Sequence, residues 1–162
     1  MVAAKYTEVK LTIVEYTFAR LASMLNVGPR VRLDMSFDLI CYRDCLEFYM
    51  EACESIEYRP AGLTFEDMGE RLKESLFTFH RFHLIHKDIK PRNIVYSPYH
   101  SHYVFCDFGI SCPVLETVGF SSKTYREGTE KYMSADMMGI GENGEGFVDL
   151  YFNDVFALYK TL

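Results

Sequence analysis

The sequence lacks the marks of a membrane protein, a secreted protein or a general nucleic-acid binder. No apolar run reaches membrane-spanning length, and the first ten residues lack the apolar core of a signal peptide. Basic residues are not in excess, because 17 Lys and Arg face 23 Asp and Glu, for a formal net charge of -6. Since nucleic acids and anionic membranes attract cationic surfaces, we expect neither as a partner.

Paired cysteine motifs are also missing. The five cysteines are odd in number and include no Cys-x-x-Cys pair, which predicts reduced thiols and a cytoplasmic location. The stretch CYRDC (41–45) contains half of a possible zinc site, but no second ligand pair follows it.

What is present is an apolar content of 49%, ample for a packed core. Four apolar residues at helical spacing predict a helix that ends at Gly28-Pro29: Val14, Phe18, Leu21 and Leu25. Residues 31–39 alternate between apolar and polar side chains, which predicts a half-buried strand with 45–50 as its antiparallel partner. The polar stretch 54–62, with Pro and Gly, is the best candidate for a hinge or a domain boundary.

The second part of the chain begins with a helix that Thr64 can cap. Its apolar stripe is expected to comprise Phe65, Met68, Leu72, Leu76 and Phe79. Two strand-like runs follow, at 93–97 and 102–106. We expect residues 109–146 to be loop-like and residues 147–162 to form a helix.

The stretch HLIHKDIKPRN (83–93) surrounds one acid with cations. Its Asp is followed by Lys two residues later and by Asn five residues later, and the two strand-like runs then lead to Asp-Phe-Gly at 107–109. This arrangement resembles the protein kinase family, whose catalytic loop reads His-Arg-Asp-Leu-Lys-Pro-x-Asn. FYMEAC (48–53), GTEKYMSAD (128–136) and NDVFAL (153–158) match further family segments in the same order.

The resemblance implies an α+β, protein kinase-like two-lobe fold. The N-lobe, with a reduced antiparallel sheet, and the hinge would occupy residues 1–53, and a mainly helical C-lobe residues 54–162. Both lobes would be truncated, because the N-lobe has no Gly-rich loop and the chain ends just inside the expected central helix of the C-lobe.

The resemblance also assigns catalytic roles. Asp88 would accept or orient the proton of a substrate hydroxyl, and Lys90 would lie beside the transferring phosphate. Asn93 and Asp107 would hold Mg²⁺, which prefers hard oxygen ligands. A Lys two residues after the Asp resembles the Ser/Thr branch of the family.

The nucleotide pocket would use both parts of the chain. Lys5, in a Val-Ala-x-Lys-like start, would bind the α- and β-phosphates of ATP, with Glu15, or less favourably Glu8, as its helix partner. The backbone carbonyl of Glu51 and the backbone N–H of Cys53 would pair with adenine, with Met50 at the back of the pocket.

An activation segment would begin at Phe108 and Gly109 and would include Thr129, whose hydroxyl is expected near Asp88 and Lys90. In related kinases the Arg before the catalytic Asp often holds a phosphate of this segment. The chain has Lys87 there, which can attract a phosphate on Thr124 without gripping it in a planar fork.

Several features depart from the family. Residues 1–40 contain one glycine, Gly28, so the Gly-rich loop over the ATP phosphates is missing. The GxGxxG match at 139–144 follows no strand and carries glutamates, so we interpret it as a flexible connection. Ser134-Ala135-Asp136 replaces Ala-Pro-Glu. The final helix is apolar around its circumference, so we expect marginal stability, self-association through this helix, or a covering partner.

Three functions remain open. The first is a Ser/Thr protein kinase that transfers the γ-phosphate of Mg-ATP to protein hydroxyls. The alternative is a pseudokinase or truncated kinase that acts as a regulatory or binding module for a partner kinase or a protein substrate. The third is a small-molecule phosphotransferase with the same Asp-x-x-x-x-Asn pattern, against which Lys90 and the GTEKYM segment (128–133) count.

Overall fold

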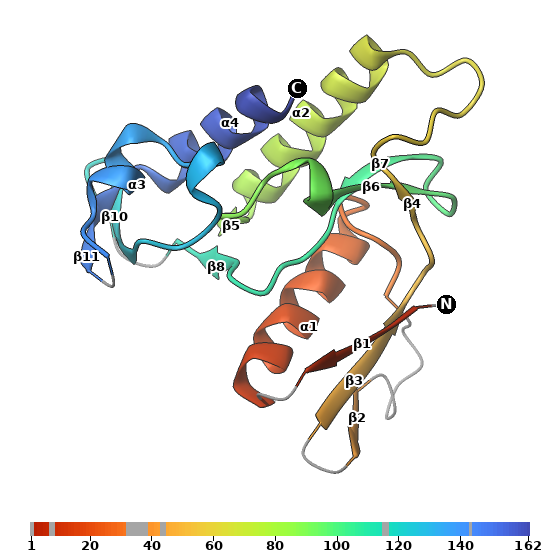
Figure 1. The fold of residues 1–162 in the computed structure, drawn as a ribbon, viewed down its shortest axis with the longest axis horizontal. Coiled ribbons are helices and arrows are strands. Elements are labelled where there is room, and N and C mark those ends of the chain that lie inside the picture. Colours follow the sequence, from red (N-terminus) through yellow and green to blue (C-terminus); the bar gives the residue numbers. More distant parts are fainter. Residues whose placement is uncertain (1, 7–8, 32–38, 43–44, 115–116, 143) are drawn as a thin grey trace.

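The computed structural model describes most of the chain, namely residues 2–6, 9–31, 39–42, 45–114, 117–142 and 144–162. Side chains are described in residues 13–31, 50–114, 119–142 and 144–162. Antiparallel sheets and helices are combined, as the α+β prediction required (Figure 1). Among the described residues, no helix is both long enough and apolar enough to cross a membrane.

A three-stranded antiparallel sheet forms the N-terminal end of the molecule (Figure 1). Its strands are β1 (Val2–Tyr6), β2 (Leu39–Tyr42) and, in the centre, β3 (Cys45–Met50). The predicted antiparallel strand at 45–50 is therefore confirmed. Most of the predicted strand at 31–39 lies outside the described residues, although Val31 forms an antiparallel bridge with Met50.

Helix α1 (Val9–Met24) packs against the core through its C-terminal half. The helix ends where the N–H groups of Val27 and Gly28 both donate to the carbonyl of Ala22, as the Gly28-Pro29 stop predicted. A Cβ atom on Gly28 would lie 2.7 Å from Ala22 Cβ and 3.2 Å from the Phe108 ring. Glycine is therefore required here for the end of α1 to pack against the Asp-Phe-Gly segment.

Helix α2 (Phe65–Arg81) begins with the predicted cap. The Thr64 hydroxyl accepts from the Asp67 N–H at 3.0 Å, and the Asp67 carboxylate accepts from the Thr64 N–H at 2.9 Å, which is a capping box. Four members of the predicted stripe are buried: Met68, Leu72, Leu76 and Phe79. The prediction was wrong for Phe65, which is 63% exposed, because the first turn extends past the core and places its ring against the Arg59 guanidinium.

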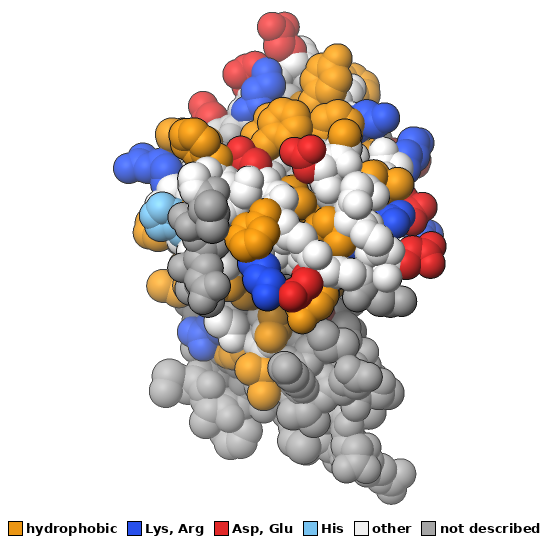
Figure 2. Space-filling model, turned by 90° about the vertical axis from the view of Figure 1, so that its left-hand side faces the viewer, with side chains coloured by type: hydrophobic (Ala, Val, Ile, Leu, Met, Phe, Trp, Pro, Cys, Tyr) orange, Lys and Arg blue, Asp and Glu red, His pale blue; other side chains and the backbone are white. Residues whose placement is uncertain are grey.

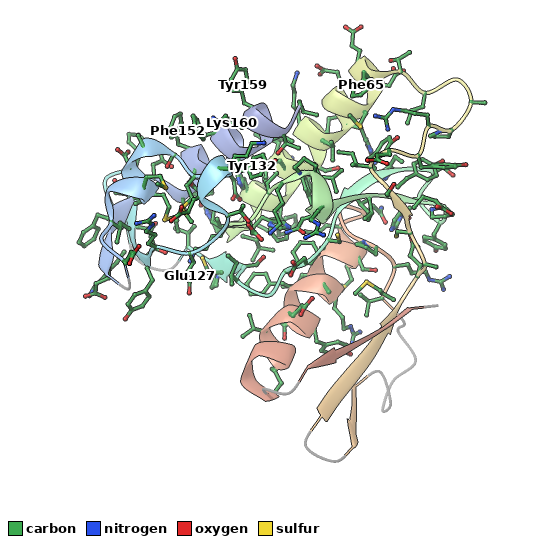
Figure 3. The ribbon with its side chains drawn as sticks, in the orientation of Figure 1. Phe65, Glu127, Tyr132, Phe152, Tyr159 and Lys160 are labelled. Carbon is green, nitrogen blue, oxygen red and sulfur yellow. The ribbon has the colours of Figure 1, made fainter. Side chains whose placement is uncertain are left out.

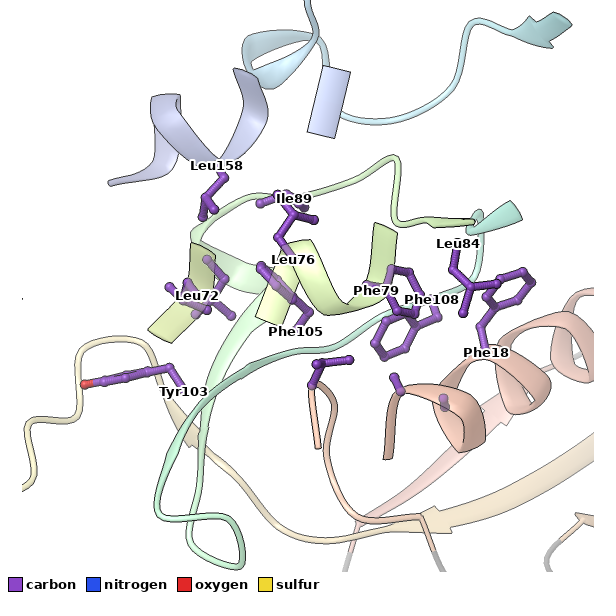
Figure 4. Close-up of a cluster of buried hydrophobic side chains, with 14 of the residues drawn as sticks. Phe18, Leu72, Leu76, Phe79, Leu84, Ile89, Tyr103, Phe105, Phe108 and Leu158 are labelled. Atoms are coloured by element: carbon purple, nitrogen blue, oxygen red, sulfur yellow. The ribbon is translucent and has the colours of Figure 1, made fainter. Parts of the chain in front are cut away.

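The two predicted strand-like runs form a hairpin of β6 (Ile94–Ser97) and β7 (His102–Phe105), and the short β4 (Glu54–Ser55) pairs with β6. The main hydrophobic core lies between this hairpin, α1, α2 and α4 (Leu150–Thr161) (Figure 4). Its labelled members in Figure 4 are Phe18, Leu72, Leu76, Phe79, Leu84, Ile89, Tyr103, Phe105, Phe108 and Leu158. The core therefore supports the stretch 83–93 and the Asp-Phe-Gly segment directly.

The expectation that residues 109–146 are loop-like was wrong. This stretch contributes β8 (Cys112–Pro113), which pairs with β5 (Leu84–Ile85), and the elements β9 (Thr117–Val118), β10 (Ser121–Tyr125), α3 (Ala135–Gly139) and β11 (Glu145–Val148). Strand β10 forms because it pairs with β9 and β11, and its inward residues are hydroxyl side chains, which give no apolar alternation in the sequence. The surface at this end of the molecule, where β10, β11 and α3 lie, carries both exposed hydrophobic and charged side chains (Figure 2).

The final helix, α4 (Leu150–Thr161), starts three residues later than predicted. Phe147 belongs to β11, and the Asp149 side chain caps the helix by accepting from the Phe152 N–H at 2.9 Å. The outer face of α4 is apolar and exposed, as expected: Phe152 is 52%, Val155 50% and Tyr159 80% exposed. Tyr159 points away from the body of the molecule (Figure 3).

Candidate active site

The loop at 86–93 is held in place by a buried acid of α4. The Asp154 side chain is fully buried, and its two oxygens accept from the backbone N–H groups of His86, at 2.8 Å, and Lys87, at 2.9 Å. His80 Nε2 lies 3.2 Å from the same carboxylate. These contacts fix the start of the loop on the core.

His86 connects this loop to the strand before Asp107. The Asp88 N–H donates to His86 Nδ1 at 3.3 Å, so the neutral ring carries its proton on Nε2, which lies 3.1 Å from the Cys106 carbonyl. Burial lowers the pKa of His86 and outweighs the nearby acids, so the ring is neutral at pH 7. The ring also packs against Phe108, with 5.1 Å between centroids.

The carboxylate of Asp88 lies at the centre of a small polar network. Lys90 Nζ donates to Asp88 Oδ2 at 2.6 Å, and the Thr129 hydroxyl donates to Oδ1 at 2.7 Å. Lys90 Nζ also donates to the Thr129 hydroxyl at 2.8 Å, which closes a triangle. Asn93 Nδ2 donates to the Asp88 carbonyl at 2.9 Å and to Oδ2 at 3.1 Å. The sequence placed Thr129 near Asp88 and Lys90, and the geometry confirms this proximity.

The charge state of Asp88 follows from this network. Partial burial works to raise its pKa, but the hydrogen bonds from Lys90 and Thr129 and the Lys90 charge together hold that pKa below its ordinary value. Asp88 is therefore ionised at neutral pH and can accept a proton from a hydroxyl group.

Asn93 and Asp107 can each offer a side-chain oxygen, and the chain brings them near each other, since the N–H of Cys106 donates to the Asn93 backbone carbonyl at 2.9 Å. Because the Nδ2 of Asn93 is used on Asp88, its carbonyl oxygen is the atom that can serve as a ligand. Asp107 is exposed and has a left-handed backbone, with φ 64°. A Cβ on Gly109 would lie 3.6 Å from Asp107 Oδ1 and 3.9 Å from Glu15 Oε2, so these two carboxylates converge on the Asp-Phe-Gly turn.

This donor set fits Mg²⁺ held together with phosphate groups. Mg²⁺ is usually bound by one or two carboxylates plus substrate phosphates and water, rather than by a cage of protein side chains. Within the described ranges, no three His, Cys, Asp or Glu residues group to hold a metal without such help. Asn93 and Asp107 would be the ligands, as the sequence predicted.

The stretch predicted to meet adenine is fixed by the chain before it. The Glu51 N–H donates to the Arg30 carbonyl at 2.9 Å, and the Cys53 thiol donates to Glu51 Oε1 at 3.3 Å. Burial and the Glu51 hydrogen bond raise the pKa of Cys53, so this thiol stays protonated. Met50 lines a small cavity together with Cys106 and residues of α1 and the Asp-Phe-Gly segment, which places the hinge next to Asp107.

Lys5, the predicted phosphate-binding lysine, lies on β1 opposite Glu47 of β3. Its side chain lies outside the described residues, as does Glu8, so the predicted contacts of Lys5 stay predictions. Glu15, the preferred helix partner, is 4% exposed and lines the same cavity as Met50 and Asp107.

The sequence did not single out Glu127, which forms an ion pair with Lys87. A Lys next to the catalytic Asp was expected to attract a phosphate on Thr124, but Lys87 already has this acidic partner. The sequence offers little to reveal this pair. Glu127 stands next to the matched segment that begins at Gly128, but 40 residues separate it from Lys87.

The departure at 134–136 has a structural explanation. Ser134 caps α3, its hydroxyl accepting from the Met137 N–H at 3.4 Å, and its own N–H donates to Asn153 Oδ1 at 3.0 Å. Asp136 is exposed. The serine therefore joins the end of the segment to α4.

Comparisons with known proteins concern the family and the fold of the chain. A sequence model of the protein kinase domain matches residues 42–156, which is most of the chain. The chain is similar to the Cydia pomonella granulovirus kinase PK-1, with a TM-score of 0.62 and 16% identity, over 96% of this chain and 55% of that one. The chain therefore spans about half of that kinase, and the likeness concerns the fold.

Two curated relatives match parts of the chain. A serine/threonine-protein kinase 1 of Heliothis zea nuclear polyhedrosis virus is 32% identical over 68 residues, 42% of this chain and 23% of the relative. A non-specific serine/threonine protein kinase of Drosophila melanogaster is 35% identical over 53 residues, 31% of this chain and 8% of the relative. The family match over 42–156, the two-lobe kinase fold and the order of the motifs lead to one conclusion: this chain belongs to the protein kinase family.

Proposed function

We propose that this chain is a Ser/Thr protein kinase, which transfers the γ-phosphate of Mg-ATP to serine and threonine hydroxyls of a protein substrate. The observation that carries the proposal is the triangle of Asp88, Lys90 and the Thr129 hydroxyl. It supports the proposal because one alcohol oxygen already donates to Asp88 and accepts from Lys90, the pair of contacts that an acceptor hydroxyl needs.

Asp88 and Lys90 have different proposed roles in the transfer. Ionised Asp88 receives the proton of the acceptor hydroxyl at Oδ1, or orients the hydroxyl by accepting its hydrogen bond. Lys90, which donates to the Thr129 hydroxyl in this structure, would place a cation beside the oxygen of the acceptor hydroxyl. Asp154 and His86 hold the loop that carries both groups, so that little reorganisation is needed when a substrate binds.

Asn93 and Asp107 would hold Mg²⁺, and the hinge at 50–53 would receive adenine. When bound, Mg-ATP supplies the phosphoryl group and the positive charge that offsets its negative oxygens. Lys5 is the proposed phosphate-binding cation, and buried Glu15 is its proposed partner.

A regulatory or binding module is the second candidate. One observation favours it: both carboxylate oxygens of Asp88 already accept hydrogen bonds from the chain itself, Oδ1 from Thr129 and Oδ2 from Lys90 and Asn93, so the loop is satisfied without a substrate. Such a module would bind nucleotide weakly or not at all and would engage a partner kinase or a protein substrate through its surface.

Calorimetric titration with Mg-ATP, ATP without Mg²⁺, and adenosine separates the two candidates. A kinase binds Mg-ATP more tightly than adenosine, and Asp107→Ala weakens the binding of Mg-ATP by at least about tenfold while adenosine binding changes little. The exposed Asp136→Ala is the matched control and leaves both affinities unchanged. Equal weakening of both ligands by Asp107→Ala would make Asp107 a structural residue, and absent binding of either ligand would favour the module.

A further inference from the structure

Three consecutive residues of the activation segment lie on the catalytic loop. Glu127 forms an ion pair with Lys87, and the Thr129 hydroxyl bonds to Asp88 and Lys90. Between them, Gly128 has φ 116°, and a Cβ atom on it would lie 2.6 Å from the Lys87 carbonyl oxygen. A residue with a Cβ atom would clash at this position. Residues 127–129 therefore contact residues 87–90 directly.

Lys87 connects residues 127–129 to the buried part of the molecule. Its side chain is only 4% exposed, while that of Glu127 is 43% exposed. The Lys87 N–H is held by Asp154, and its backbone has a left-handed conformation with φ 69°. A buried ammonium group is costly without an acidic partner, so the Glu127 carboxylate stabilises both the lysine and the segment that carries it.

Within the described part of the chain, Glu127 is the acid that pairs with the Lys87 ammonium group. The hollow beside it is lined by Cys112, by Ser122 and Thr124 of β10, and by two acids, Glu127 and Glu145. The Glu145 carboxylate pairs with Lys123 at 2.8 Å, which leaves Glu127 as the partner of Lys87. The Thr124 hydroxyl is turned to the Tyr125 carbonyl, at 3.2 Å. A phosphate on Thr124 would therefore have to compete with Glu127 for Lys87.

We infer that Glu127 is a positioning residue for phosphoryl transfer, which acts through Lys87 to order the activation segment without an added phosphate. The inference rests on the proposed kinase function. By holding residue 127, the ion pair keeps the Thr129 hydroxyl, two residues later, on Asp88 and Lys90 (Figure 3 labels Glu127 on the loop after β10).

The test compares the full chain with three variants, each produced with and without a co-expressed phosphatase and checked by intact mass. Glu127→Gln removes the charge, and Glu127→Asp keeps it on a shorter side chain. Glu145→Gln is the matched control, because Glu145 lies on the neighbouring strand and its exposed carboxylate pairs with Lys123 instead. The readouts are amide hydrogen exchange of residues 121–132 and the kcat and KM values for a serine peptide and for ATP.

Glu127→Gln is expected to lower kcat for the peptide by about tenfold to a hundredfold, with an unchanged KM for ATP. Exchange in residues 121–132 is expected to speed up by at least about tenfold in the same variant. Glu127→Asp restores part of both losses, Glu145→Gln matches the wild type, and phosphatase treatment of the wild type changes neither readout.

Unchanged exchange and unchanged kcat in Glu127→Gln would overturn the inference, as would a wild type that loses both properties after phosphatase treatment. If the wild type transfers no phosphate, the proposed function fails by itself. The exchange comparison then still decides the role of Glu127: faster exchange in Glu127→Gln supports the positioning contact, and equal exchange overturns it.

Discussion

The Thr129 hydroxyl and the Asp88 carboxylate lie 2.7 Å apart, although 41 residues separate them in the sequence. The threonine donates to Asp88 and at the same time accepts from Lys90, so the position of the activation segment is coupled directly to the Asp88 carboxylate. Catalysis in this site should therefore be sensitive to the segment as well as to the loop.

Thr129→Val should lower the rate of phosphoryl transfer by about tenfold to a hundredfold, because a hydrogen bond to a charged group is worth about 1.5–3 kcal/mol. Thr129→Ser keeps the hydroxyl and should stay within about threefold of the wild type. Steady-state kinetics with a serine peptide provides the measurement. A valine variant as active as the serine variant would show that the hydroxyl does not position Asp88.

Asp154→Ala should reduce the free energy of unfolding by about 2–5 kcal/mol, because it leaves the buried N–H groups of His86 and Lys87 without their acceptor. Asp149→Ala is the matched control in the same helix. It removes the cap from the Phe152 N–H and should cost about 1 kcal/mol. Urea denaturation measures both values, and equal losses in the two variants would contradict the anchoring role of Asp154.

His86 should make stability depend on pH. Burial lowers its folded pKa, so below about pH 6.5 the unfolded chain binds a proton that the folded chain does not. The free energy of unfolding therefore falls as pH decreases from about 6.5 to the folded pKa, by up to about 1.4 kcal/mol per pH unit from this group. Above pH 6.5 the contribution of His86 is fully present.

The comparison of wild type with His86→Gln between pH 8 and pH 5 isolates this contribution. Burial also lowers the pKa values of His100 and His102, and these two residues remain in both proteins. The variant should be less stable at pH 8, because it loses the ring between Asp88 and Cys106, and its stability should fall less steeply with acid. Parallel curves for the two proteins would mean that His86 is not held neutral in the fold.

Sequence patterns predicted those parts of the molecule whose signal is local. Helix α2 was found because its cap and its apolar stripe lie within one stretch, and Phe65 was misassigned because periodicity does not say how far the core extends along a helix. Strand β10 was missed because its buried positions carry Ser122 and Thr124, and it becomes a strand through its pairing with β9 and β11.

In the candidate site, too, the residues with a local signal were predicted and the contacts between distant segments were not. Asp88, Lys90 and Asn93 were found because their spacing within one loop is the signal. The ion pair of Lys87 and Glu127 joins two loops that only the folded chain brings together, and no spacing rule connects them. For the same reason the start of α4 was set too early, since Phe147 is drawn into a sheet by a distant strand.

The transfer of labelled phosphate from Mg-ATP to a mixture of serine, threonine and tyrosine peptides tests the central claim most directly. The wild-type chain should label serine and threonine peptides, only with Mg²⁺ present, and Asp88→Asn should reduce the rate by about 10²–10⁴-fold while the thermal unfolding midpoint stays close to that of the wild type. Equal labelling by wild type and Asp88→Asn, or no labelling by a folded wild type that binds Mg-ATP, would contradict the assignment of this site to protein phosphorylation.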